Sequence, residues 1–234
     1  MRALFDNKVL DATLSSLYGN VDFPASNIKS PFLNMKFKSM GINDTVRALF
    51  PTNITADCFF YGYTNAESMT VRIYSHESVL LETITVDCSY PTGSAFFTKR
   101  SGIRWIDVEA TSPATEDLYI GGFAFGESVL FPDPIATFEK DVNDKSNMDS
   151  NDAGQVSYQY IRPLLQYQLN FKYTEIDQWE DIFNKYLEIG GGLKLIDITE
   201  NNHERYRPIY CTTEMNKPTR DRTVDFSMDI KEAR

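Results

Sequence analysis

Six residues, Met69-Thr70-Val71-Arg72-Ile73-Tyr74, alternate between apolar and polar side chains. A period of two is typical of a strand with one buried face. Similar short stretches recur along the first half of the chain, at 46–50, 59–63, 80–86, 104–108 and 118–123. Turn residues separate them, and no helical periodicity interrupts them. Short strands in this arrangement indicate an antiparallel β-sandwich or jelly roll, which we predict over residues 1–135.

The composition changes after this module. Residues 139–152 hold almost no apolar side chain. Such a stretch cannot bury enough surface to fold by itself. We therefore expect residues 136–155 to form a polar linker or a long loop.

Residues 156–234 follow a different pattern. The stretch 165–173 alternates strictly, and apolar side chains then recur at helical spacing over 176–187. Thr174 is a suitable N-cap for that helix, and Gly190 is expected to end it. Three further strands are expected at 193–198, 208–213 and 223–230. The pattern predicts a small α+β unit with one helix on an antiparallel sheet.

Charge and cysteine content exclude some classes of protein. The 234 residues include 33 acidic and 23 basic side chains, for a net charge of −10. A negative field argues against nucleic acid as a partner. We expect no membrane insertion, because no apolar run is long enough, and no signal peptide, because charge interrupts the N-terminus. We expect Cys58, Cys88 and Cys211 to be reduced thiols of a protein made in a cytoplasm, although a Cys58–Cys88 disulfide remains an alternative.

Catalytic and metal-binding patterns are weak. The two histidines, His76 and His203, both lie in polar, turn-like surroundings without a nucleophile motif. The stretch from Asp149 begins like a calcium loop but has Ala153 and Tyr160 where oxygen ligands are needed. The Gly121-Gly122 pair suits a strand closely approached by other backbone. We expect no enzymatic activity, no metal and no cofactor; a hydrolase acting on the cell envelope is a third hypothesis.

Two groups of segments resemble bacteriophage proteins. The first comprises Asp11–Ser16, Phe23–Ile28 and Leu118–Gly126, with Phe131-Pro132 following. It resembles discoidin-like jelly-roll modules of phage tail proteins. The second comprises Tyr158–Tyr167, the capped helix and Gly190–Leu195. It looks like the closing segment of small virion proteins near the tail tip of long-tailed phages.

The resemblance implies a non-enzymatic structural component of a phage virion, in the tail or its tip. Such a protein would form a symmetric ring or dock on one, with other virion proteins and further copies of itself as partners. Tyr158, Tyr160 and Arg162 are the candidate assembly interface, because Tyr and Arg are enriched where proteins meet. The alternative is that the two tyrosines pack internally.

A second hypothesis is a carbohydrate-binding module that contributes to adsorption on host-surface glycans. Discoidin-like folds as a class often bind sugars or lipids, so the resemblance supports it as well. Tyr61, Tyr63 and Trp105 are the candidate sugar-stacking residues on an open sheet face. The competing interpretation is that these rings fill the core.

Overall fold

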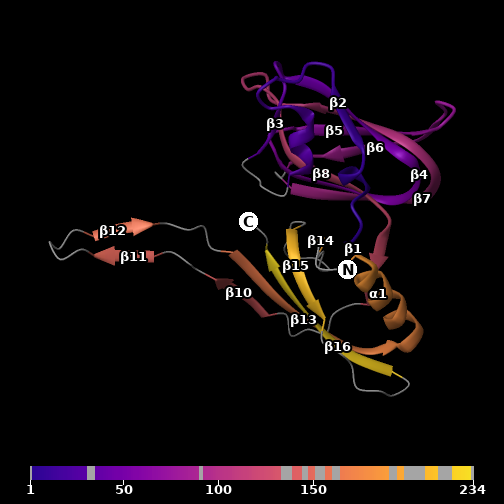
Figure 1. Ribbon diagram of the computed structural model, residues 1–234, viewed down its shortest axis with the longest axis vertical. Coiled ribbons are helices and arrows are strands. Elements are labelled where there is room, and N and C mark those ends of the chain that lie inside the picture. The colour runs from indigo at the N-terminus through magenta and orange to yellow at the C-terminus, as the bar shows by residue number, and fades with distance from the viewer. Residues whose placement is uncertain are drawn as a thin grey trace. The chain divides into compact units, whose positions relative to one another are not determined.

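The computed structural model describes residues 2–30, 35–89, 92–132, 139–143, 147–150, 156–159, 164–189, 194–197, 209–215 and 223–232. The chain divides into two compact units. Unit 1 comprises Met1–Leu130 with Lys194–Pro208, and unit 2 comprises Phe131–Leu193 with Ile209–Arg234. Figure 1 shows the helices and strands of both units.

Unit 1 is built from antiparallel strands. They are β2 (Thr13–Ser16), β3 (Phe37–Lys38), β4 (Asn43–Thr64), β5 (Ser68–Ser75), β6 (Leu80–Asp87), β7 (Thr92–Thr111) and β8 (Tyr119–Gly126). Their order is β3-β8-β4-β7-β5-β6, with β2 also paired to β4. Three short strands, β1 (Arg2–Leu4), β9 (Ser128–Leu130) and β14 (Lys194–Asp197), pair with β1 in the middle. Two 3-10 turns, η1 (Lys8–Leu10) and η2 (Ala25–Lys29), complete the unit.

The long strands β4 and β7 take part in both layers of the sandwich. The first part of β4 pairs with residues 105–111 of β7 and with β2, and its last part pairs with residues 92–96 of β7 and with β8. Side chains from both layers share one hydrophobic core, which includes Val46, Val71, Ile106, Phe59 and Phe123. The predicted mainly β fold of sandwich or jelly-roll type is therefore confirmed.

Aromatic side chains fill much of this core. Phe50 and Phe125 stack with ring centroids 6.0 Å apart, and Phe59 lies 5.8 Å from Phe123. All four rings are fully buried. Burying a phenylalanine stabilises a fold by about 1.5–3 kcal/mol. The abundance of Phe thus stabilises the sandwich itself.

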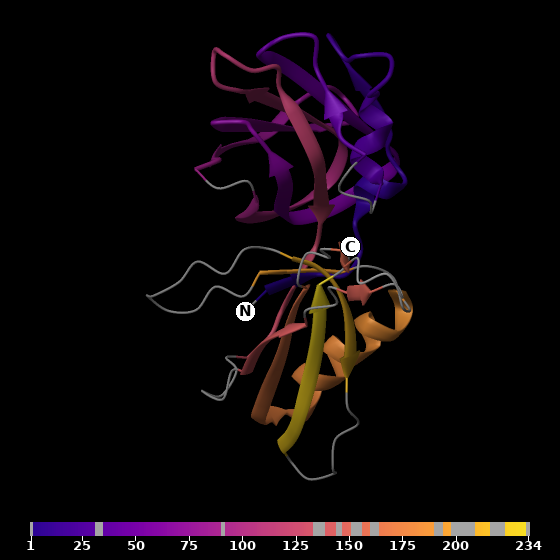
Figure 2. The same cartoon turned by 90° about the vertical axis from the view of Figure 1, so that its left-hand side faces the viewer.

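Unit 2 contains a small antiparallel sheet in the order β10-β13-β16-β15. Its strands are β10 (Glu139–Asn143), β13 (Leu164–Glu175), β15 (Ile209–Met215) and β16 (Thr223–Glu232). Helix α1 (Ile176–Ile189) follows β13 directly and lies along one face of the sheet, as the orange helix of Figure 2 shows. Phe171 stacks on Phe226 at 4.6 Å. The predicted α+β arrangement with one helix is confirmed.

Two local expectations differ from the structure. The stretch predicted as a polar linker or loop contains β10 and β11 (Asn147–Ser150), because ladder hydrogen bonds to β13 and to β12 (Val156–Gln159) satisfy its backbone. Helix α1 begins at Ile176, so Thr174 belongs to β13 rather than capping the helix. The helix ends at Ile189, before Gly190 as expected. Among the described residues, no helix combines the length and the apolar character that crossing a membrane requires.

Candidate functional site

The outer face of the β2-β4-β7-β5-β6 layer presents two parallel rows of side chains. Register places Leu49, Trp105, Tyr74 and Leu80 opposite one another on β4, β7, β5 and β6. We call this set the aromatic row. Two residues further along the strands, register aligns Arg47, Asp107 and Arg72, which we call the charged row.

Strand alternation explains why both rows face outward. The intervening residues Ala48, Ile73 and Ile106 are completely buried in the core. Since successive side chains of a strand point to opposite faces, their sequence neighbours must point away from the core. The neighbours that therefore point to the outer face are Arg47, Leu49, Arg72, Tyr74, Trp105 and Asp107.

A stacked aromatic pair forms the centre of the aromatic row. The rings of Tyr74 and Trp105 lie 5.3 Å apart with an interplanar angle of 14°. Both residues are half-buried, whereas the flanking Leu49 and Leu80 are 40% and 50% exposed. The indole Nε1 of Trp105 is buried and has no hydrogen-bond partner among the described residues. Stacking and packing, rather than a hydrogen bond, therefore fix the ring.

The charged row is organised around Asp107. This buried carboxylate accepts two hydrogen bonds of 2.7 Å, from Nε and Nη2 of Arg47. The same pairing raises the pKa of Arg47 above its ordinary value. The guanidinium carbon lies 5.6 Å from the centre of the Trp105 ring. Arg72 pairs with Glu109 at 2.7 Å on the same face. A half-exposed arginine is thus held beside an aromatic surface.

The structure does not bring together the three residues predicted to stack on a sugar. Tyr61 is 4% exposed and part of the core, and its hydroxyl donates to the carbonyl oxygen of Asp87 over 3.1 Å. Tyr63 is half-buried with a φ of 56°, in the left-handed region. Trp105 alone reaches the outer sheet face described above. The alternative interpretation, a ring filling the core, holds for Tyr61.

Of the other candidate residues, some lie within the described part of the chain and others lie outside it. Tyr158 belongs to β12, while Tyr160 and Arg162 lie outside the described residues, so the assembly interface stays a prediction. His76 is exposed in the turn after β5, and His203 lies outside the described part of the chain. The predicted stacking set missed Tyr74, Arg47 and Asp107. The period of two could have grouped Arg47 with Leu49, and Trp105 with Asp107, but strand pairing was needed to join the groups.

The cysteines and carboxylates form no reactive cluster in the part of the chain that the structure describes. Cys58 and Cys88 are buried free thiols, so the alternative of a disulfide between them is wrong. Burial raises the pKa of both thiols, that of Cys88 to about 11. The described residues contain no group of three or more His, Cys, Asp or Glu side chains able to hold a metal ion.

About half of the chain is similar in structure to several solved sugar-binding modules. No family model and no curated protein matches the chain. Half of the chain (51%) is similar to 98% of chitosan-binding module 1 from a chitosanase/glucanase of Paenibacillus sp. IK-5, with 16% identity and a TM-score of 0.45. A Streptococcus pneumoniae fucose binding module is similar over 52% of this chain and 94% of that one, with 11% identity and a TM-score of 0.44. At these values the similarity assigns no ligand to this chain.

Unit 1 is an antiparallel β-sandwich, and its outer sheet face is the candidate site. Neither of these two modules is described as a bacteriophage protein. The virion role that the sequence resemblance implies stays a prediction.

Proposed function

We propose that unit 1 binds carbohydrate through the aromatic row and the charged row. The observation that carries this proposal is the stacked pair of Tyr74 and Trp105 beside the Arg47–Asp107 pair. A pyranose ring has an apolar face of C–H groups and a rim of hydroxyls. Aromatic side chains can stack on the apolar face, while neighbouring polar side chains exchange hydrogen bonds with the hydroxyls.

The charged row suits the second part of this task. Asp107 occupies Nε and Nη2 of Arg47, and this pairing fixes the plane of the guanidinium. The arginine side chain is still 53% exposed, so its outer N–H groups can reach a ligand. A pre-oriented donor loses less conformational entropy on binding than a free side chain.

The length of the aromatic row indicates the size of the ligand. Neighbouring strands are about 4.8 Å apart, so a row across four strands spans about 14 Å. This length exceeds the width of one sugar ring. We therefore expect a short oligosaccharide segment of a polysaccharide to bind better than a monosaccharide.

A glycan array probed with the labelled full-length chain, followed by calorimetry with the best oligosaccharide, tests the proposal. Trp105→Ala should weaken binding about tenfold or more, as expected for a central aromatic contact. Arg47→Ala should also weaken it while leaving the fold intact, because this side chain is half exposed.

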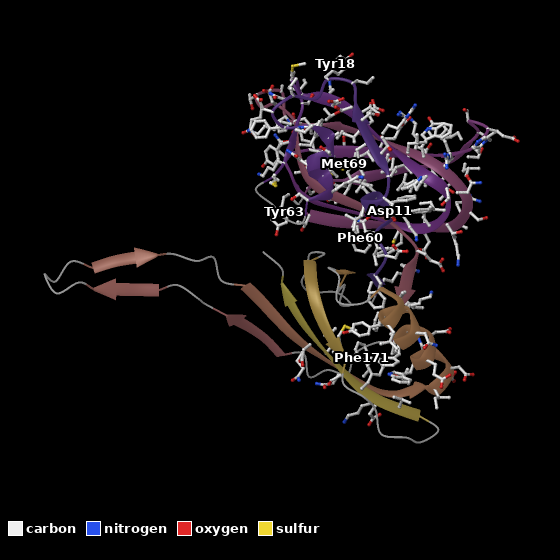
Figure 3. The ribbon with its side chains drawn as sticks, viewed as in Figure 1. Asp11, Tyr18, Phe60, Tyr63, Met69 and Phe171 are labelled. Atoms are coloured by element: carbon white, nitrogen blue, oxygen red, sulfur yellow. The ribbon has the colours of Figure 1, made fainter. Side chains whose placement is uncertain are left out.

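Tyr18→Ala is the matched control, since Tyr18 is an exposed aromatic residue that belongs to neither row; Figure 3 labels it at one end of unit 1. Its affinity should equal that of the unmodified protein. Absence of binding to every glycan at millimolar ligand would contradict the proposal. So would an affinity that depends on Tyr18 but not on Trp105.

One backbone feature favours a second candidate function, a structural subunit of a larger assembly such as a phage virion. Strands β11 and β12 pair only with each other among the described residues. An isolated two-stranded ribbon is marginally stable in water, so a further strand or surface should cover it. Detection of the protein in purified phage particles supports this candidate, and its presence in infected cells but not in particles contradicts it.

A further inference from the structure

One end of unit 1 exposes a group of apolar side chains. Leu17, Tyr18, Val21 and Met40 are between 58% and 90% exposed. They come from two loops that run side by side: the Met40 amide donates to the Tyr18 carbonyl over 2.8 Å, and Gly19 forms a β-bridge with Ser39. We call these four residues the loop-end patch. Figure 3 labels Tyr18 at one end of unit 1.

The patch is held in a fixed shape. The amides of Leu17 and Tyr18 donate to the carboxylate of Asp44, at 3.1 and 3.2 Å, and Asp44 is only 3% exposed. Ser39 Oγ also donates to the Tyr18 carbonyl over 3.4 Å. Hydrophobic side chains on a rigid loop bind a partner at a lower entropic cost than those on a free loop. Apolar groups gathered at the surface usually mark an interaction site.

Charges of both signs surround the patch. Lys36 and Lys38 lie on residues 36–40, which we call the central segment, over the rings of Tyr119 and Phe23. The two segments paired to it carry exposed acidic residues, Asp22 on one side and Glu116 with Asp117 on the other. An anionic lipid surface would be repelled by these acids. A partner for this end therefore needs an apolar centre with both cations and anions around it.

We propose that the loop-end patch binds the same patch of a second copy of this chain. In a two-fold interface a surface meets itself, so it must supply both partners of every contact. The loop-end patch does so, because its apolar centre can meet another apolar centre while the central lysines of one copy face the flanking acids of the other. The proposal is independent of carbohydrate binding on the outer sheet face.

Sedimentation velocity of the full chain over a wide concentration range tests this proposal. The unmodified protein should associate reversibly to a dimer. Val21→Asp and Met40→Asp should each raise the dissociation constant about tenfold or more, because each buries a carboxylate in the apolar centre. Val79→Asp is the matched control, since Val79 is exposed in the turn between β5 and β6, and this variant should dimerise normally.

Hydrogen exchange of the unmodified protein gives a readout that needs no variant. Amides in residues 17–23 and 38–42 should exchange more slowly at concentrations where the dimer forms. A protein that stays monomeric at all concentrations overturns the proposal. Association that both aspartate variants leave unchanged also overturns it and points to unit 2 instead. Binding to phosphatidylglycerol vesicles that Val21→Asp abolishes, without self-association, would assign the patch to a lipid surface.

Discussion

Arg47 on β4 and Asp107 on β7 face each other in register and share two hydrogen bonds of 2.7 Å. The Asp107 side chain is 11% exposed, while the arginine side chain is 53% exposed. One partner is thus anchored in the sheet and the other is presented to solvent. This relationship makes the outer sheet face a candidate recognition surface rather than a flat layer of unrelated side chains.

The Asp107→Asn substitution tests how far this anchoring stabilises the fold. An asparagine keeps the size but lacks the charge and one of the two acceptors. We expect a loss of about 1 kcal/mol in the free energy of unfolding, measured by urea denaturation, because the arginine remains partly solvated. Glu109→Gln is the control, since it removes the more exposed Arg72–Glu109 pair and should change stability by less than about 0.5 kcal/mol. Equal effects of the two substitutions would contradict the account.

The Gly126→Ala substitution tests the packing of the N-terminal segment on β8. A Cβ at Gly126 would lie 2.6 Å from the Asp6 carbonyl oxygen and 2.9 Å from Leu4 Cδ1. Because backbone must shift to relieve this contact, we expect a loss of about 2 kcal/mol in stability. A Cβ at Gly41 meets nothing within 4 Å, so Gly41→Ala should be neutral or slightly stabilising. Thermal melting of the two variants compares them directly, and a neutral Gly126→Ala would place the segment elsewhere.

The Asp44→Ala substitution tests the shape of the loop end. It leaves the amides of Leu17, Tyr18 and Thr45 without the carboxylate that accepts from them. We expect a loss of about 2–4 kcal/mol, together with faster hydrogen exchange at Leu17 and Tyr18. Asp22→Ala, a change at an exposed residue, should cost less than about 0.5 kcal/mol. Unchanged exchange at the two amides in the Asp44 variant would show that other contacts hold the loop.

The buried Cys88 thiol predicts a loss of stability in alkali. Its pKa is raised by burial from 9.0 to about 11. The unfolded chain therefore releases this proton first, so stability is intact below pH 9.0 and falls until about pH 11, by about 2 kcal/mol. Denaturation curves across this range check the slope. Other groups titrate in this range too, so the free energy of unfolding is compared between the unmodified protein and Cys88→Ala. It should fall less steeply with pH in Cys88→Ala, and an equally steep fall in both proteins would contradict the prediction.

Much of the fold follows from patterns within single strands. The alternation in 69–74 and 104–108 predicts strands whose buried faces the structure confirms. The Gly121-Gly122 pair predicts close backbone approach, and a Cβ at Gly121 would indeed lie 2.7 Å from Tyr63 Cβ. Information of this kind is local, so the sequence alone contains it.

The position of Tyr61 could not be derived in this way. Ala48 and Ala56 face the core on even-numbered positions of β4, whereas Phe59 and Tyr61 face it on odd-numbered ones. The register of β4 with β7 shifts between Ala56 and Cys58, and such an irregularity exchanges the two faces of a strand. Sequence alternation does not reveal it. The same reasoning applies to the aromatic row, which exists only because three strand pairings align residues distant in the chain.

Carbohydrate binding at Trp105 is tested most directly by the indole N–H signals in a two-dimensional ¹H–¹⁵N NMR titration of the full chain. The chain has two tryptophans, Trp105 and Trp179, so the spectrum holds one reporter at the proposed site and one in helix α1 as an internal control. Trp179→Phe assigns the signals. With the oligosaccharide selected on the array, the Trp105 indole signal should shift in a saturable manner while that of Trp179 stays in place. Saturable binding that leaves the Trp105 signal unmoved would contradict the account.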